Sequence, residues 1–147
     1  MPTIQKSQVM PLILAACPGF QSRWDEHLEF WKGEEAGVYN DLGEFAHFIV
    51  DAYECQDIEP IVAAFGVIER LLGEGDEEVQ TAAAIGFLED VRNIASHRPF
   101  GEVVFVQWLG PKSGKEWAEI EEVWRGKTSL MDVVRTEIKD SKNKQKS

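Results

Sequence analysis

Residues 57–95 read DIEPIVAAFGVIERLLGEGDEEVQTAAAIGFLEDVRNIA, and this stretch decides the fold. Its apolar residues recur every three or four positions, which is the period of one face of an α-helix. The first run consists of Ile61, Ala64, Phe65, Ile68, Leu71 and Leu72. The second consists of Val79, Ala83, Phe87, Val91 and Ile94. The pattern therefore predicts one helix over residues 57–72 and another over residues 76–95.

The residues at the ends of the two runs support these helices. Pro60 suits a first helical turn, where no backbone N–H needs a partner. Asp76 can cap the second helix, and Glu77 and Glu78 stand where the helix dipole favours anions. Because the connection is short, we expect an antiparallel hairpin that resembles one HEAT-type unit. No repeat at a fixed period extends it into an array.

The rest of the chain also has mainly helical patterns. We predict helices over residues 4–17, 22–32, 40–55, 114–125 and 129–138. Residues 101–110 are ambiguous: Val103–Val106 has strand propensity, but a single short strand has no evident partner, so we favour a helix. The prediction is an all-α, compact single domain of about six to eight helices over residues 1–138. The lysine-rich residues 139–147 are predicted to be a disordered tail.

The composition is that of a globular protein. Of 147 residues, 44% are hydrophobic and 28% are charged, a balance that supports a buried core. Two cysteines, Cys17 and Cys55, provide neither a disulfide framework nor a zinc site, which favours a reducing cytoplasm. Leu14–Cys17 resembles a lipoprotein processing site, but a helix that ends at Pro18 is the favoured interpretation. No apolar run reaches the ~20 residues of a membrane helix.

Charge is distributed unevenly along the chain. Residues 25–90 contain 18 acidic and 2 basic residues, a net charge of −16, whereas the whole chain carries −11. Such a field repels nucleic acid and attracts basic proteins. The alternative is that these carboxylates only keep the protein soluble.

No sequence motif indicates catalysis or a cofactor. Glu44 and His47 have the Glu-x-x-His spacing of di-iron bundles, but the second such motif is missing, and His47 with Asp51 is more simply a surface pair. Both cysteines lie at the C-terminal ends of predicted helices, where the dipole does not lower a thiol pKa. Gly110–Lys115 lacks the spacing of a phosphate-binding loop. We predict a protein that is not an enzyme and has no metal or cofactor.

Two pairs of tryptophans have the same spacing. Trp24 and Trp31 lie seven residues apart, as do Trp117 and Trp124, so each pair occupies one helix face. Tryptophan rows usually pack into a core, and we favour that interpretation over a binding surface.

Residues 65–79, 86–93 and 108–113, followed by Trp117 and Trp124, resemble a family of small bacterial helical proteins of unknown function. Its members look like immunity proteins of polymorphic-toxin and contact-dependent competition systems. The resemblance extends from about Pro11 to Trp124 and carries no catalytic motif. It implies a cytoplasmic protein that neutralises a toxin.

Our leading hypothesis is therefore an immunity or other toxin-binding protein whose acidic face meets a basic toxin domain, without nucleic acid or membrane. Binding residues often lie in loops and at helix starts. The candidates are Glu34, Glu35, Tyr39, Asp41, Glu74, Asp76, Glu77 and Glu78. For the last four, helix capping and solvation are the simpler roles. The alternatives are a helical adaptor, which predicts an exposed apolar groove, and a metal-dependent or hydrolytic enzyme, which predicts a pocket around Glu44 and His47.

Overall fold

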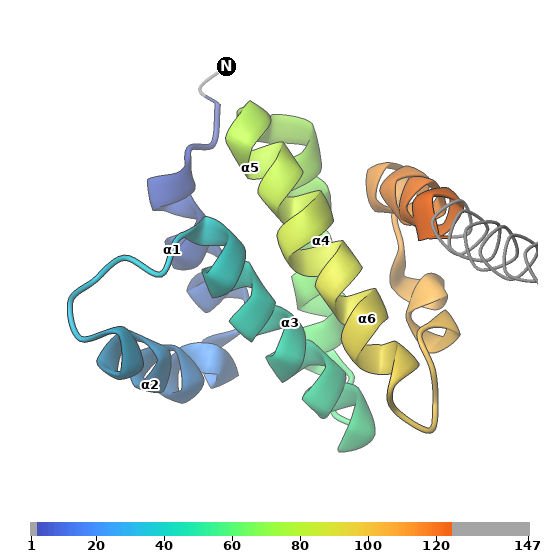
Figure 1. Ribbon diagram of the computed structural model, residues 1–147, viewed down its shortest axis with the longest axis horizontal. Coiled ribbons are helices and arrows are strands. Elements are labelled where there is room, and N and C mark those ends of the chain that lie inside the picture. Colours follow the sequence, from blue (N-terminus) through green and yellow to red (C-terminus); the bar gives the residue numbers. More distant parts are fainter. Residues whose placement is uncertain (1–2, 125–147) are drawn as a thin grey trace, which may run out of the picture. The chain divides into compact units, whose positions relative to one another are not determined.

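The computed structural model describes residues 3–124, and within that range the protein is all-α (Figure 1). The helix predicted over residues 129–138 and the tail predicted over residues 139–147 lie outside the described residues. Contacts group the described residues up to Trp117 into one compact unit, and the residues after it fall into a second. The named elements are α1 (Lys6–Ala16), η1 (Pro18–Phe20), α2 (Gln21–Trp31), α3 (Val38–Glu54), α4 (Glu59–Glu74), α5 (Glu77–Thr81), η2 (Ala82–Glu89), α6 (Asp90–Ser96) and η3 (Val103–Trp108).

Five phenylalanines form a continuous line through the core of the first unit. Ring centroids are 5.1 Å apart between Phe20 and Phe45, 5.4 Å between Phe45 and Phe87, and 5.7 Å between Phe87 and Phe65. Phe105 extends the line, 6.2 Å from Phe65. All five side chains are buried. Since they come from η1, α3, η2, α4 and η3, this line joins most of the fold.

The second predicted helix is continuous but not uniform. Residues 77–96 run through α5, η2 and α6 without a break, and η2 is a π-helical stretch. This composite helix packs mainly against α3 and less against α4. At Gly86 an added Cβ would lie 3.3 Å from the Tyr39 Cα, so this glycine allows the close approach to α3. The HEAT-like pairing with α4 is not confirmed.

The corner between α4 and α5 is narrow and holds the N-terminal segment. The Ile4 N–H donates to Glu74 O at 2.9 Å, and the Asp76 N–H donates to Ile4 O at 2.9 Å. Asp76 also caps α5, because its carboxylate accepts from the Val79 N–H at 2.9 Å. The prediction for Asp76 is therefore confirmed. Ile4 belongs to an isolated bridge with Gly75 and not to the first helix, which begins at Lys6.

Two helices begin before the residues predicted for them. α2 continues directly from η1 and begins at Gln21, so Ser22 lies inside the helix and does not cap it. The last described helix begins at residue 111 and not at Gly114. Its first turn is capped by Glu69 of α4, whose carboxylate accepts from the backbone N–H groups of Lys112 and Ser113. The Ser113 hydroxyl instead accepts from the Gly110 N–H at 2.8 Å.

The ambiguous stretch at residues 101–110 contains the 3₁₀ helix η3. The favoured prediction of a helix was thus right, but the helix is a 3₁₀ helix, whose turns are tighter than those of an α-helix, and it is only six residues long. Phe105 is its one fully buried residue, whereas Val103 is 73% exposed. The valines of this stretch favour a β-strand, but the described residues offer no neighbouring strand for it to pair with. The local structure therefore follows from the burial of Phe105.

Candidate functional site

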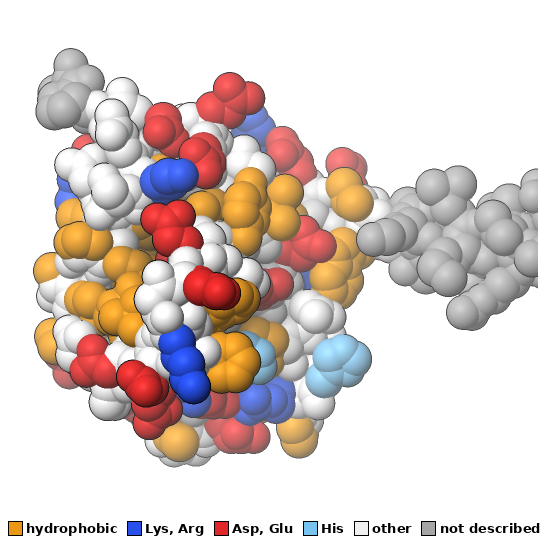
Figure 2. All heavy atoms as spheres, turned by 60° about the vertical axis from the view of Figure 1, so that its left-hand side comes forward, with side chains coloured by type: hydrophobic (Ala, Val, Ile, Leu, Met, Phe, Trp, Pro, Cys, Tyr) orange, Lys and Arg blue, Asp and Glu red, His pale blue; other side chains and the backbone are white. Residues whose placement is uncertain are grey.

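A hollow of about 570 Å³ lies beside α2, and we call it the α2 hollow. Its walls come from α1, α2, the loop at residues 32–37, the first turn of α3 and the start of α5. The lining residues are Lys6, Ser7, Trp24, His27, Leu28, Trp31, Gly33, Glu34, Glu35, Ala36, Gly37, Val38, Tyr39, Asp41 and Glu78. Figure 2 views this side of the molecule and shows hydrophobic side chains gathered together, with acidic side chains around them.

The α2 face of the hollow is a row of aromatic rings. Trp24, His27 and Trp31 follow one another along one side of the helix. The Trp24 and His27 rings stack with their centroids 5.4 Å apart, and Trp31 lies edge-on to His27 at 6.3 Å. None of the eleven residues of α2 is fully buried. The core position favoured for Trp24 and Trp31 was therefore wrong, because α2 lies at the edge of the fold and both side chains are partly exposed.

The other tryptophan pair differs from this one. Trp117 is 5% exposed, and the guanidinium carbon of Arg92 lies 5.6 Å from its ring centroid. Its role in the core is therefore confirmed, whereas Trp124 stays partly exposed. Equal spacing in the sequence thus led to two different environments.

His27 joins the aromatic row to α3. Its Nε2 lies 2.9 Å from Asp41 Oδ1, and the His27 side chain is only 9% exposed. Burial raises the pKa of the Asp41 carboxyl, the contact with His27 opposes that shift, and the negative charge of Glu35 adds to it. Asp41 is therefore a poorly solvated carboxylate beside another carboxylate, and that arrangement favours a neighbouring cation.

The loop after α2 presents two carboxylates at the hollow. The backbone turns there through positive φ angles at Lys32 (48°), Gly33 (85°) and Gly37 (92°). Glycine adopts such angles without steric cost, whereas any other side chain at position 33 or 37 would be strained by the positive φ. Between the two glycines, Glu34 and Glu35 are exposed and line the hollow.

The eight candidate residues divide between different environments. Five of them line the α2 hollow: Glu34, Glu35, Tyr39, Asp41 and Glu78. Glu74 instead pairs with Arg70 at 2.9 Å and borders a separate hollow near Thr3 and Gln8. Asp76 is the α5 cap, and Glu77 is exposed in the first turn of α5 outside both hollows. Sequence reasoning missed Trp24, His27 and Trp31 as site residues, although their spacing placed them on one face.

A second hollow, of about 540 Å³, lies on the other side of α2, toward α3 and α6. Glu44 and His47 line it together with Asp90. Burial raises the pKa of the Asp90 carboxyl, Glu89 adds to that shift, and His47 opposes it. Within residues 3–124, no three His, Cys, Asp or Glu side chains are grouped to hold a metal ion.

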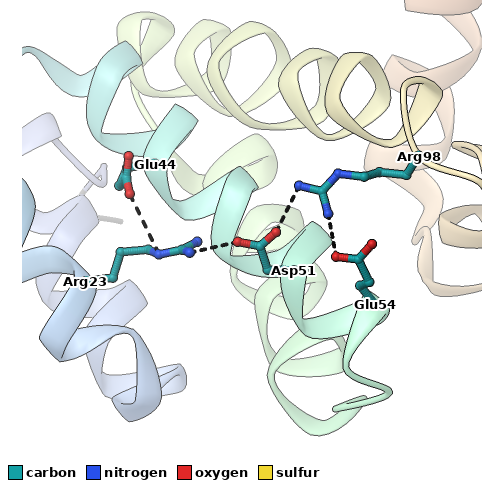
Figure 3. A network of polar contacts seen from close by, with 5 residues as sticks. All are labelled: Arg23, Glu44, Asp51, Glu54 and Arg98. Carbon is teal, nitrogen blue, oxygen red and sulfur yellow. Dashed lines mark hydrogen bonds and ion pairs between the residues drawn. The ribbon is translucent and has the colours of Figure 1, made fainter.

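The sequence suggested that Asp51 pairs with His47. Asp51 lies instead between two arginines (Figure 3). Arg23 Nη2 is 2.7 Å from Asp51 Oδ2, and Arg98 Nη2 is 2.9 Å from Asp51 Oδ1. The network continues to Glu44 through Arg23 and to Glu54 through Arg98. It therefore ties α2 and the segment after α6 to α3. Burial alone would raise the pKa of Asp51, but the hydrogen bonds and charges of the arginines hold it below its ordinary value.

Replacing Asp51 by asparagine is expected to lower the free energy of unfolding by about 1–2 kcal/mol at pH 7, a value reduced for partial exposure. A carboxyl whose pKa is lowered by folding stabilises the fold above its unfolded pKa of about 3.9. That stability is lost as the pH falls through the lower folded pKa. Urea denaturation should therefore give a gap between the two proteins that is full at pH 6–7 and closes toward pH 3.

The control for this prediction is Asp57→Asn, because Asp57 is exposed. Its denaturation midpoint is expected to follow the wild type at every pH. If the gap for Asp51→Asn stayed constant down to pH 3, the loss would come from packing and not from charge, which would contradict the prediction.

The cysteines have different surroundings. Cys17 is buried, its Sγ lies 3.4 Å from Pro60 O, and burial raises its pKa to about 11. Cys55 is exposed at the end of α3. The thiol of Cys17 is therefore protonated at neutral pH and packs as a small apolar group.

Among the helices of the described residues, none combines the length and the apolar character that spanning a membrane requires. Comparisons with curated proteins and with solved structures each find no match. A family model described as a domain of unknown function (DUF7674) matches residues 10–125. That match runs from within α1 to the last described helix and covers every residue that lines the α2 hollow except Lys6 and Ser7, and the chain belongs to this family.

Proposed function

We propose that this protein is a non-catalytic binding module that captures a basic protein through the α2 hollow and the acidic surface around it. The observation that carries the proposal is the composition of the hollow. Four carboxylates, those of Glu34, Glu35, Asp41 and Glu78, surround a floor of aromatic and aliphatic side chains, and Lys6 is the one lysine or arginine among the described lining residues. Interfaces combine an apolar centre with a charged rim in this way.

The specific partner that we propose is a bacterial toxin domain, which this protein would neutralise in the cytoplasm as an immunity protein. Such a protein must associate quickly, and complementary charge raises association rates. The net charge of −16 over residues 25–90 provides that attraction for a basic partner.

A helical adaptor is the second candidate, and the exposed side chains of α2 favour it. Phe30 is 78% exposed and Leu28 is 49% exposed, so α2 presents apolar surface as well as the acidic rim. A partner held mainly through Phe30 and Leu28 would bind with little dependence on salt, because apolar burial is not screened.

The two candidates are separated by affinity capture from the native organism at low and at high salt. The toxin-binding role predicts one basic protein whose association slows at least tenfold as salt rises, and cells that make both proteins should survive. Capture of a housekeeping complex that persists at high salt would support the adaptor and overturn the immunity assignment.

Neutralising the rim of the hollow is expected to slow association with the captured protein by about tenfold or more at low salt, because steering depends on charge. The variant, called the rim variant, combines Glu34→Gln, Glu35→Gln and Glu78→Gln. Its matched control combines Asp57→Asn, Glu59→Gln and Glu77→Gln, which removes the same charge from exposed positions outside the hollow. Surface plasmon resonance would measure both. Equal losses would show that net charge, and not the hollow, directs association.

A further inference from the structure

We propose that the α2 hollow is a receptor for one arginine side chain of the partner, which stacks on the Trp24–His27–Trp31 row and pairs with the carboxylates opposite. This inference rests on the proposed function and names its central contact. It is carried by three features of the hollow: unpaired carboxylates, an aromatic wall and two carboxylates that lie close together.

Three of the four carboxylates of the hollow are free to accept a cation. Within the described residues, Glu34, Glu35 and Glu78 form no ion pair, unlike Glu44, Asp51 and Glu54 elsewhere on the molecule. Glu34 and Glu35 lie on the loop and Glu78 lies on α5, so the negative charges approach the hollow from two sides. A single cation between them would meet several carboxylates at once.

Asp41 adds a reason for a cation at this place. Its carboxyl is half-buried next to Glu35, and the contact with His27 compensates its charge only in part. Two neighbouring carboxylates repel each other, and a positive group between them would remove that repulsion. The free protein therefore carries an electrostatic cost at the hollow that a bound cation would relieve.

The aromatic wall selects arginine over lysine. A guanidinium is planar, weakly hydrated and able to stack on an aromatic face while its N–H groups form paired bonds with carboxylates. Trp24 and His27 stack on each other with 29° between their planes, and the side chains of Trp24 and Trp31 stay partly exposed, so a guanidinium can contact them. The ammonium group of lysine is compact and strongly hydrated, and it would gain less from that wall. The volume of about 570 Å³ falls within the usual range for ligand sites, roughly 300–1,000 Å³.

The test uses the full chain and a capped peptide, acetyl-Ala-Ala-Arg-Ala-Ala-amide, followed by nuclear magnetic resonance of the tryptophan indole N–H groups. Trp24→Phe and Trp31→Phe variants assign the two signals. We expect the Arg peptide to shift the signals of Trp24 and Trp31 and to leave those of the other three tryptophans in place. The peptide with lysine should bind more weakly. The peptide with citrulline, which has the shape of arginine without its charge, should bind at least tenfold more weakly.

The rim variant should weaken binding of the arginine peptide at least fivefold, and the control with Asp57→Asn, Glu59→Gln and Glu77→Gln should stay within twofold of the wild type. All six positions that the two variants change are exposed, so circular dichroism should show intact helices in both variants. Equal binding of the citrulline peptide, absence of binding, or shifts that leave the Trp24 and Trp31 signals in place would each overturn the inference.

The peptide result and the capture result can fail separately. If the arginine peptide does not bind but a basic protein is captured and lost in the rim variant, the arginine inference is overturned and the proposed function is supported. If the peptide binds at Trp24 and Trp31 but no basic protein is captured, the arginine site is supported and the proposed function is overturned.

Discussion

Replacing Phe87 by alanine is expected to lower the free energy of unfolding by about 3–5 kcal/mol, the usual range for a buried phenylalanine. Phe87 is fully buried and lies between Phe45 of α3 and Phe65 of α4, with ring centroids 5.4 and 5.7 Å away. Its removal would leave a cavity where three elements meet. Because a native domain is stable by only about 5–15 kcal/mol, this loss would consume a large share of the total.

Urea denaturation at pH 7 measures this effect, and the melting temperature should fall by roughly 10 °C or more. Phe30→Ala is the matched control, because it makes the same chemical change where the ring is 78% exposed. We expect that control to change stability by no more than about 0.5 kcal/mol. A loss under about 1.5 kcal/mol for Phe87→Ala, below the range for core aromatics, would mean that the five phenylalanines do not form one closely packed core.

The apolar period predicted the two central helices well because it is a local property. All six residues assigned to the buried face of α4 are buried in the structure. In the next helix Val79, Ala83, Phe87 and Val91 are buried, and Ile94 is half-buried. Such a period identifies the face that avoids water, whichever element comes to cover it.

The packing partner of that second helix could not be predicted from the same pattern. A short connection suggested pairing with α4, but residues far apart in sequence bring α3 against η2. Ala82, Ala84, Gly86 and Leu88 are buried in addition to the predicted face, so η2 is covered around most of its surface. Small side chains allow such close packing, yet nothing in a helical period indicates that a second neighbour is present.

Helix caps showed the same difference between local and distant causes. Asp76 caps the helix that immediately follows it, and the sequence predicted this correctly. Glu69 caps a helix that begins more than 40 residues later, and no local signal announces it. Ser113 and Glu116 have the spacing of a capping box, which is why the helix was predicted to begin at residue 114, but Ser113 already lies inside the first turn. The hydrogen bonds with Glu69 lower its pKa, although burial acts in the opposite direction.

For the candidate site, sequence reasoning found the charges but not the surface between them. Clustered acidic residues in the loop and at helix starts led to four of the residues that line the α2 hollow, and Tyr39 between them was the fifth. The tryptophans were assigned to the core because large aromatic rings usually bury. That reasoning failed for α2, since whether a helix lies at the edge depends on its contacts and not on its own residues. The site thus combines a feature that is visible in composition with one that is visible only in three dimensions.

Replacing Gly75 by alanine is expected to lower the free energy of unfolding by about 2–3 kcal/mol, near the upper end for overpacking. Gly75 has an ordinary φ of −73°, so the cause is space and not backbone conformation. An added Cβ would lie 2.4 Å from the backbone oxygen of Leu71 and 2.5 Å from Val79 Cγ1. The corner between α4 and α5 would have to open, and the hydrogen bonds with Ile4 on either side of Gly75 would weaken with it.

Gly66→Ala is the matched control and should change stability in the opposite direction. Gly66 lies inside α4 with no atom within 4 Å of an added Cβ, so alanine is expected to stabilise the helix by about 0.5–1 kcal/mol. Urea denaturation gives both values, and hydrogen exchange of the Ile4 and Asp76 amides should be faster in Gly75→Ala alone. A neutral or stabilising Gly75→Ala, with those amides still protected, would mean that the corner tolerates a side chain. The bridge to Ile4 would then not depend on the close approach of backbone at Gly75, and the glycine would only end α4.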